Sequence, residues 1–264
     1  MVTYNIHKSR GLDGRVRPDR ILRVLSEINP DVIALQEVVS RESSRADHHQ
    51  TRYLAEKFGY YAEIGENRRH QGGAYGNVLL SRYPILAARN HDISVPGRER
   101  RGCLHAEVEH SSGFIVHLFN VHLGTAYFER RIQARELFRR RLFTDPDLAG
   151  RTIVLGDFNE WTRGLASRMF TAHFQSAHGQ MPMRRPHTFP GFLPLLRLDH
   201  IYFDRELRLE DVSIHRSPTA LVASDHLPLV AEFALPQPSE AATGSSSQTP
   251  APPPLPPDGP ELRA

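Results

Sequence analysis

The sequence predicts an α/β fold in which two packed, mixed β-sheets carry helices on their outer faces. Short apolar runs that are typical of strands outnumber the amphipathic stretches that are typical of helices along the 264 residues. Helical stretches flank only some of these runs, which favours mixed sheets over a single parallel sheet. No long apolar run of the kind that crosses a bilayer is present. We therefore expect a globular α/β domain.

The N-terminal part alternates strands with helices. Val2–Ile6 reads as a strand, and Pro18–Ile28 reads as a helix because proline stands in its first turn and apolar residues recur on one face. Val32–Leu35 is a short, fully apolar strand. A second helix is expected over Asp47–Phe58, where the following glycine, Gly59, ends it.

Strands dominate the rest of the chain. The strands expected after the second helix are Tyr60–Ile64, Asn77–Ser81, Ile85–Val95, Cys103–Glu109 and Phe114–Val121. Helices are expected over Phe128–Phe143 and Leu165–Thr171, on either side of a strand at Ile153–Leu155. The strands that close the fold are Ile201–Phe203, Leu207–His215 and Leu229–Leu235.

Composition divides the chain into a folded domain at residues 1–235 and a tail at residues 236–264, which is rich in proline and serine and which we expect to be disordered. The single cysteine, Cys103, excludes an internal disulfide. No signal-peptide pattern precedes the first strand, so we expect a cytoplasmic protein. We also expect a monomer with no obligate protein partner. Only four residues precede Asn5, so a start upstream of Met1 and peripheral membrane association both stay open.

Polar residues recur where the predicted strands should end. Eight of them form the candidate site: Asn5, Glu37, His122, Asp157, Asn159, Asp199, Asp225 and His226. Strand ends are where a rigid scaffold presents functional groups to a cleft. The eight residues offer hard oxygen ligands, neutral amides and imidazoles. Such groups suit the metal-assisted attack of water on a phosphate.

Two segments carry most of the metal and nucleophile chemistry. Glu37 follows an apolar strand, and a carboxylate there is costly unless a divalent cation neutralises it. Asp157 and Asn159 follow Gly156, which lets the backbone turn sharply so that both side chains can point the same way. An ordinary surface glutamate and a turn-forming Asp/Asn pair are the alternatives for these two segments.

Histidines supply the acid–base candidates. His226 can exchange a proton near neutral pH if a carboxylate fixes its tautomer, and Asp199 is the candidate for that carboxylate. Neighbouring residues on a strand point apart, so Asp225 is expected to contact a metal instead. His122 ends a strand and could donate a hydrogen bond to a phosphoryl oxygen.

Taken together, these segments resemble the endonuclease/exonuclease/phosphatase superfamily, from about Val2 to Phe233. The resemblance implies a four-layer α/β/β/α sandwich like that of deoxyribonuclease I, with the site at one end of both sheets. It also implies a phosphoesterase that uses Mg²⁺ or Mn²⁺. The substrate class stays open between nucleic acid, a phospholipid head group and an inositol phosphate.

The resemblance also implies a role for each matching residue. Glu37 matches the principal metal ligand, with Asn5 and Asp225 beside it. His226 matches the histidine that activates water or stabilises the phosphoryl group, and Asp199 its orienting carboxylate. The other matches are Asp157 and Asn159 for positioning the nucleophile and phosphate, His122 for contacting the phosphate, and Asn77 and Arg101 for the substrate region.

One departure bears on substrate. Apurinic endonucleases have a carboxylate two residues after the first asparagine, whereas this chain has His7. The chain therefore resembles a bacterial member that is not a dedicated repair enzyme, and hydrolysis of a phosphodiester or phosphomonoester is the leading interpretation. A DNA endonuclease and a catalytically inactive binding module on the same fold are the alternatives.

Overall fold

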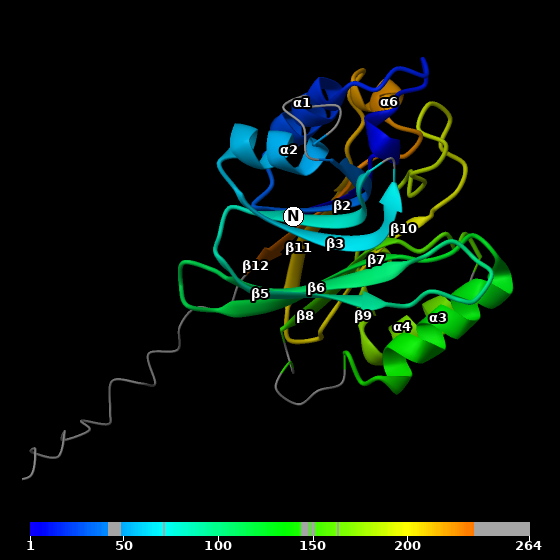
Figure 1. Cartoon of the computed structure of the whole chain (residues 1–264). Helices are drawn as coiled ribbons and strands as arrows, with labels where there is room; N and C mark the ends of the chain where they lie inside the picture. Colours follow the sequence, from blue (N-terminus) through cyan, green and yellow to red (C-terminus); the bar gives the residue numbers. More distant parts are fainter. Residues whose placement is uncertain (42–48, 71, 144–147, 149–150, 163, 235–264) are drawn as a thin grey trace, which may run out of the picture.

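The computed structural model describes residues 1–41, 49–70, 72–143, 148, 151–162 and 164–234. The tail predicted at residues 236–264 lies outside this part, as does residue 235 at the end of the predicted domain. Two six-stranded sheets pack face to face, and helices cover their outer faces (Figure 1). The predicted four-layer α/β sandwich is therefore confirmed. Within the described residues, no helix is both long enough and apolar enough to cross a membrane.

The first sheet contains the N-terminal and C-terminal strands. Its order is β11 (Arg208–Ile214), β12 (Leu229–Ala234), β1 (Val2–Asn5), β2 (Val32–Ser40), β4 (Gly73–Ser81) and β3 (Tyr61–His70). Only β1 and β2 are parallel neighbours. The elements on its outer side are α1 (Pro18–Ile28), α2 (Gln50–Phe58) and α6 (Ala220–Ala223). A short 3₁₀ turn, η1 (His7–Ser9), follows β1.

The second sheet is built from the middle of the chain. Its order is β5 (Ile85–Asp92), β6 (Gly102–Glu109), β7 (Ile115–His122), β8 (Thr152–Asp157), β10 (Asp199–Phe203) and β9 (Gln175–Ser176). Only β7 and β8 are parallel neighbours. The helices associated with this sheet are α3 (Tyr127–Arg139), α4 (Leu165–His173) and the short α5 (Ala177–Gln180).

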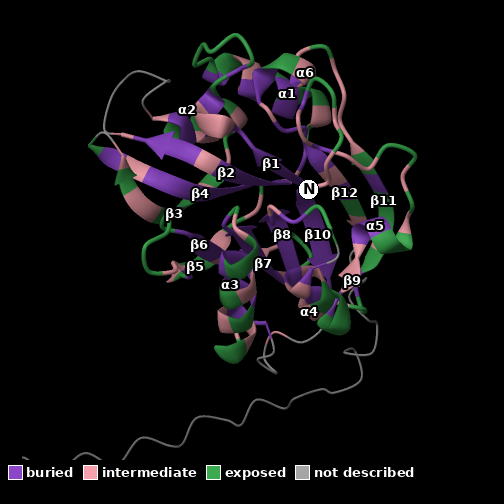
Figure 2. Ribbon diagram, turned by 90° about the vertical axis from the view of Figure 1, so that its right-hand side faces the viewer, coloured by how far each residue is buried: buried purple, intermediate pink, exposed green. Residues whose placement is uncertain are grey.

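The core follows the alternation of side chains along the strands. Between the sheets, apolar side chains such as Ala34, Leu79, Leu118 and Leu155 form one cluster, while separate clusters lie under α1 and α2 and under α3 and α4. The central strands are accordingly buried, whereas the strands β3, β5 and β11 and the outward faces of the helices are largely exposed or half-buried (Figure 2). Because both faces of the central strands are covered, these strands read as continuous apolar runs in the sequence.

Strand direction brings the candidate residues to one edge. The parallel strands β7 and β8 end there with His122 and Asp157 paired in register. Strand β10 is antiparallel to β8, so its first residue, Asp199, lies opposite Asp157. Strand β12 is antiparallel to β1, so the segment before it, which holds His226, lies beside the end of β1. Asp199 therefore begins a strand and His226 precedes one, whereas both were predicted to lie at strand ends.

Several predicted strands differ in length from those in the structure. Strand β3 continues to His70 instead of ending at Ile64, whereas β5 ends at Asp92, before the predicted Val95. Strand β2 continues to Ser40, so Glu37 lies inside it, at an irregularity between Leu35 and Val38 where Glu37 adopts a φ of 57°. Strand β4 begins at Gly73, so Asn77 also lies inside a strand. Helix α3 ends at Arg139, before the predicted end at Phe143. Gln36 and Glu37 in β2, and Gly73 and Gly76 in β4, concealed how far these strands extend.

Candidate active site

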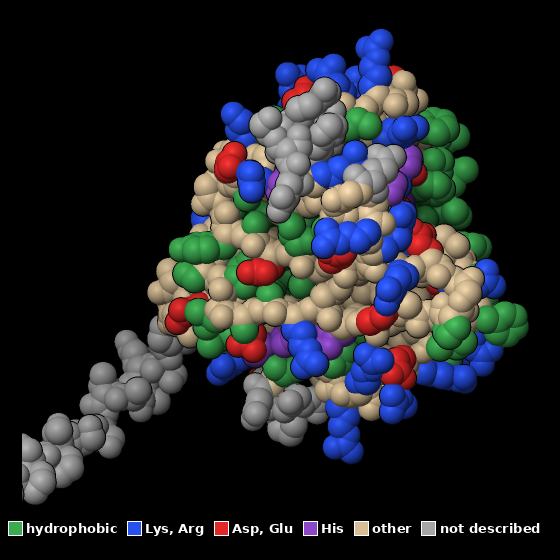
Figure 3. All heavy atoms as spheres, in the orientation of Figure 1, with side chains coloured by type: hydrophobic (Ala, Val, Ile, Leu, Met, Phe, Trp, Pro, Cys, Tyr) green, Lys and Arg blue, Asp and Glu red, His purple; other side chains and the backbone are tan. Residues whose placement is uncertain are grey.

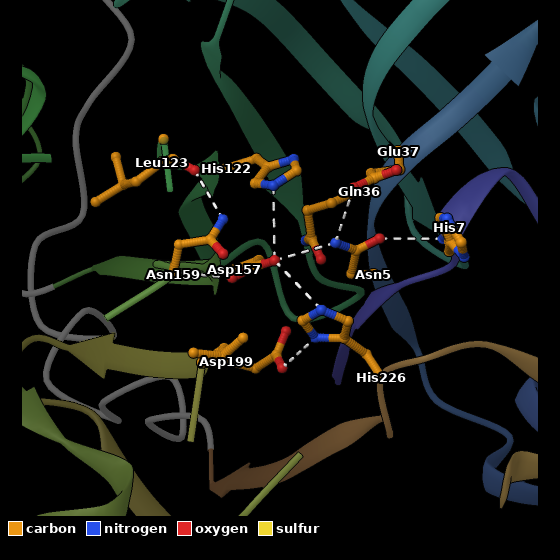
Figure 4. A network of polar contacts seen from close by, with 12 residues as sticks. Asn5, His7, Gln36, Glu37, His122, Leu123, Asp157, Asn159, Asp199 and His226 are labelled. Atoms are coloured by element: carbon orange, nitrogen blue, oxygen red, sulfur yellow. Dashed lines mark hydrogen bonds and ion pairs between the residues drawn. The ribbon is translucent and has the colours of Figure 1, made fainter. Parts of the chain in front are cut away.

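Asp157 lies at the centre of the site. It ends β8 and is 1% exposed. Its Oδ2 atom accepts a hydrogen bond of 3.0 Å from Asn5 Nδ2 and lies 3.6 Å from Nε2 of both His122 and His226 (Figure 4). The latter distances exceed those of ordinary hydrogen bonds. Two imidazoles from different sheets therefore face one carboxylate oxygen without direct hydrogen bonds to it.

His226 and Asp199 form a buried pair beside Asp157. The His226 Nδ1 atom lies 2.9 Å from Asp199 Oδ2. Burial alone would lower the pKa of His226, but the Asp199, Asp157 and Asp225 carboxylates outweigh it and raise the pKa to about 10. The ring is therefore an imidazolium at neutral pH, with Nδ1–H donating to Asp199 and Nε2–H directed at Asp157.

His122 is held in the opposite protonation state. Burial, followed by the positive charge of Arg101, lowers its pKa to about 4. Arg101 Nη1 lies 3.2 Å from His122 Nδ1, and because a guanidinium can only donate, Nδ1 must accept. The single ring proton is therefore on Nε2, which faces Asp157. Arg101, predicted to lie in the substrate region, is itself buried and contacts His122 and Glu99. Its direct contact with substrate stays a prediction.

The turn after β8 fixes the Asp157 carboxylate. Asn159 adopts a φ of 49° and its backbone N–H donates to Asp157 Oδ1 at 2.8 Å, while its Nδ2 atom donates to the Leu123 carbonyl at 2.9 Å. A β-carbon at Gly156 would lie 1.9 Å from the Val121 carbonyl oxygen, so only glycine fits there. Asn159 therefore orients the carboxylate and ties this turn to the end of β7.

Glu37 offers an ionised carboxylate at the irregularity in β2. Burial alone would raise its pKa, but the adjacent His122 and Lys8 lower the pKa to about 2. Its Oε1 atom lies 3.4 Å from Asn5 Nδ2, and its Oε2 atom accepts a 2.7 Å hydrogen bond from Lys8 Nζ. A hard carboxylate beside an amide fits Mg²⁺ or Mn²⁺ chemically. In this structure the Lys8 ammonium balances the charge of Glu37.

Asp225 lies beside His7 of the 3₁₀ turn η1. Its Oδ1 atom accepts a 3.3 Å hydrogen bond from Ser224 Oγ and lies 3.7 Å from His7 Nδ1. One carboxylate oxygen of Asp157 and one of Asp199 also lie within 4.8 Å of each other, and these two oxygens could hold a cation. The second oxygen of Asp199 is buried and has no hydrogen-bond partner among the described residues. The site thus has more ligand atoms than the predicted set of Glu37, Asn5 and Asp225.

A polar network lies beneath the site, and sequence reasoning missed most of it. Asn77 is fully buried and donates to the carbonyls of Gly102 and Asn120. The Asn120 side chain donates to the Leu35 and Val78 carbonyls of the other sheet and accepts from Gln36 Nε2 at 2.7 Å. These amides bridge the sheets. The amide nitrogen of Asn77 contacts backbone carbonyls in the core, and the substrate role predicted for Asn77 stays a prediction.

Known proteins are similar to this chain in sequence and in fold. Residues 2–226 match the model of the Endonuclease/Exonuclease/phosphatase family. The chain is 33% identical over 256 residues to the uncharacterised protein YbhP of Escherichia coli strain K12, covering 89% of this chain and 96% of that protein.

Two solved structures show the same fold at low identity. One is a mannosyl-6-phosphatase from Bacteroides thetaiotaomicron, with a TM-score of 0.69, 17% identity, and 89% and 98% coverage of this chain and that one. The other is TDP2 from D. rerio in complex with a single-strand DNA product, with a TM-score of 0.66, 19% identity, and the same 89% and 98% coverage.

Proposed function

Because the chain belongs to the endonuclease/exonuclease/phosphatase family, whose members hydrolyse phosphoester bonds, we propose that it uses water and a divalent cation to hydrolyse a phosphodiester or phosphomonoester. The observation that carries this proposal is the convergence of His122 Nε2 and His226 Nε2 on one oxygen of Asp157. Two N–H donors therefore face one proton acceptor, the Asp157 Oδ2 atom. Such a constellation matches the needs of phosphoryl transfer to water.

The two histidines bind the phosphoryl group. His226, as an imidazolium, donates from Nε2 to a phosphoryl oxygen and offsets its negative charge, while Asp199 keeps the ring protonated and oriented. Neutral His122 donates its Nε2 proton to a second oxygen, because Arg101 occupies its Nδ1 lone pair. Both donors are held in place before substrate arrives, so they lose little free energy to reorganisation as charge develops in the transition state.

Asp157 accepts the proton of the attacking water. Burial raises the pKa of this carboxylate, which increases its basicity. Asn5 and the Asn159 backbone hold its two oxygens, so that the side chain cannot turn away when a water molecule approaches. The proton moves to Oδ2, and the remaining hydroxide oxygen forms the new bond to phosphorus as the leaving oxygen departs.

Glu37, Asn5 and Asp225 would hold the cation. When bound, Mg²⁺ or Mn²⁺ supplies positive charge to the phosphate and to the leaving oxygen. Lys8 must then release Glu37, because an ammonium 2.7 Å from the carboxylate oxygen competes for the same negative charge. Lys8 belongs to the 3₁₀ turn η1, whose three residues His7, Lys8 and Ser9 all have positive φ.

Exposed apolar side chains near the site favour a phosphodiester substrate with an apolar or aromatic neighbour. They lie next to the site strands along the chain: Tyr127 and Phe128 begin α3, which follows β7, Trp161 follows β8, and Phe192, Leu193 and Leu195 precede β10. Phe128 is 72% exposed and Phe192 is 61% exposed. A phospholipid head group would bring acyl chains to such side chains. A DNA strand is the second candidate, because aromatic side chains also stack on bases.

A substrate panel tests this proposal. Plasmid DNA, single-stranded DNA, phosphoinositides and phospholipids are incubated with the chain in Mg²⁺ and in EDTA, with Asp157→Asn as a matched inactive control. We expect Mg²⁺-dependent release of product from at least one phosphoester, and no release by the variant. Equal turnover by Asp157→Asn would contradict the role of this site, and no turnover of any substrate would favour a binding module.

A further inference from the structure

A second group of metal-ligating side chains lies on the outer face of the second sheet, away from the candidate active site. His105 and Glu107 stand two residues apart on β6, so both point to the same face, and His117 on β7 pairs directly with Glu107. His117 precedes His122 by five residues on β7, a separation of roughly 16 Å along a strand. Figure 3 shows histidine atoms at the surface below β5 and β6.

The geometry of this group, which we call the β6–β7 cluster, matches a small metal ion. His105 Nε2 lies 3.3 Å from His117 Nδ1. Two nitrogens bound to one tetrahedral Zn²⁺ are separated by about 3.3–3.4 Å, given Zn–N bonds of roughly 2.0–2.1 Å. One oxygen of Glu107 and one ring nitrogen from each histidine all lie within 4.8 Å of one another. Small side-chain movements would bring the carboxylate into the same shell.

The rings around the β6–β7 cluster hold its histidines in place. His105 stacks on Phe119 with a centroid distance of 4.1 Å and an interplanar angle of 7°. On its other side, the ring of His91 from β5 stacks at 6.2 Å, and among the described residues His91 Nε2 is buried without a hydrogen-bond partner. Burial, then His117 and His91, lower the pKa of His105 to about 4. Its neutral ring therefore keeps a lone pair for a metal.

We propose that His105, Glu107 and His117 bind one divalent transition-metal ion, with Zn²⁺ as the best match. Two imidazoles and one carboxylate form a donor set that Zn²⁺ accepts, whereas Mg²⁺ prefers oxygen ligands alone. Three protein ligands leave a fourth position for water. Because the ligands come from two adjacent strands, the ion would tie β6 to β7 through their side chains.

A zinc titration that is monitored by calorimetry tests the proposal. It is performed with excess Mg²⁺ in a background that combines Glu37→Gln, Asp157→Asn, Asp225→Asn and His226→Ala, so that the ligands proposed for the candidate active site no longer compete for Zn²⁺. We expect one Zn²⁺ per chain. His105→Ala and Glu107→Gln should each weaken its affinity, the histidine change by about 100-fold or more, because loss of a direct ligand exceeds the effect of losing an outer hydrogen bond. His110→Ala, on the same β6–β7 hairpin but outside the cluster, should bind normally.

Cobalt supplies an independent readout. Co²⁺ at this site should give the intense visible absorption of a four-coordinate complex, and the His105→Ala variant should lose it. Glu107 and His105 are both partly exposed, so their variants should fold, which a thermal melt verifies. Failure to bind Zn²⁺ in excess Mg²⁺, or equal affinity in the folded His105→Ala and His110→Ala variants, would overturn the proposal.

Discussion

The substitution Asp199→Asn isolates the electrostatic effect of one carboxylate on His226. The change preserves the shape of the side chain. In the wild type the hydrogen bond from His226 Nδ1 to Asp199 Oδ2 spans 2.9 Å, and an amide oxygen can still accept it. It removes the negative charge nearest to the buried imidazolium. We therefore expect His226 to stay in place and to lose its proton at a lower pH.

The size of the effect follows from the pKa of His226. Its value of about 10 lies about 3.5 units above the ordinary 6.5, which corresponds to about 5 kcal/mol of net stabilisation of the charged ring. Asp199 is the largest favourable contributor, so the pKa should fall without it, and we take a return to the ordinary 6.5 as the case to be tested. At pH 8 only about 3% of the rings would then be protonated, a loss of about 30-fold in kcat/KM from protonation alone.

The assay is a pH profile of kcat/KM for wild type, Asp199→Asn and His226→Ala on one phosphoester. Wild type should stay active to about pH 10, since the raised pKa keeps the imidazolium charged until pH passes through that value. Asp199→Asn should recover most of its deficit at pH 6, and His226→Ala should stay impaired by several orders of magnitude at every pH. A deficit in Asp199→Asn that is equal at pH 6 and pH 8, or larger than that of His226→Ala, would refute the reasoning.

Three further predictions follow from other contacts. Lys8→Ala should tighten Mg²⁺ binding, because it removes the ammonium beside Glu37. The measure is the Mg²⁺ concentration that gives half-maximal activity, and Lys57→Ala, an exposed position on α2, is the control. Equal Mg²⁺ affinities in the two variants would contradict the prediction. Burial lowers the pKa of His200 to about 3, so below pH 6.5 the unfolded chain binds more protons than the folded chain. The free energy of unfolding therefore decreases as the pH falls, and this group accounts for a loss of about 2 kcal/mol at pH 5. His200→Gln should flatten that loss in denaturant melts, and an unchanged pH slope would argue against it. DNA nicking should fall steeply with salt and phospholipid hydrolysis should not; efficient, salt-tolerant cleavage at abasic sites would reverse the preferred substrate class.

The sequence predicted the strands well because buried strands in a two-sheet sandwich read as apolar runs. The same logic brought Asp157, His122 and Asn5 to one edge, since each ends a strand whose direction the fold fixes. Asp199 and His226 reach that edge from antiparallel strands, and strand direction cannot be read from apolar periodicity.

Other features depend on register and backbone irregularities that a linear pattern does not encode. The irregularity that turns Glu37 toward the site lies within β2, and no local signal marks it apart from polar Gln36 and Glu37 in an apolar run. The bridge from Gln36 to Asn120 joins residues 84 positions apart. Sequence reasoning gave His105 no role, because its proximity to His117 depends on how β6 pairs with β7.

The most direct test of metal-dependent hydrolysis at this site is the Mg²⁺ dependence of turnover in wild type and in Glu37→Gln. The variant keeps the size of the side chain and removes only the charge that would hold the cation. Wild type should be inactive in EDTA and regain activity with Mg²⁺, while Glu37→Gln should melt like wild type and show little activity even at high Mg²⁺. Full turnover in EDTA, or full turnover by Glu37→Gln, would contradict the account.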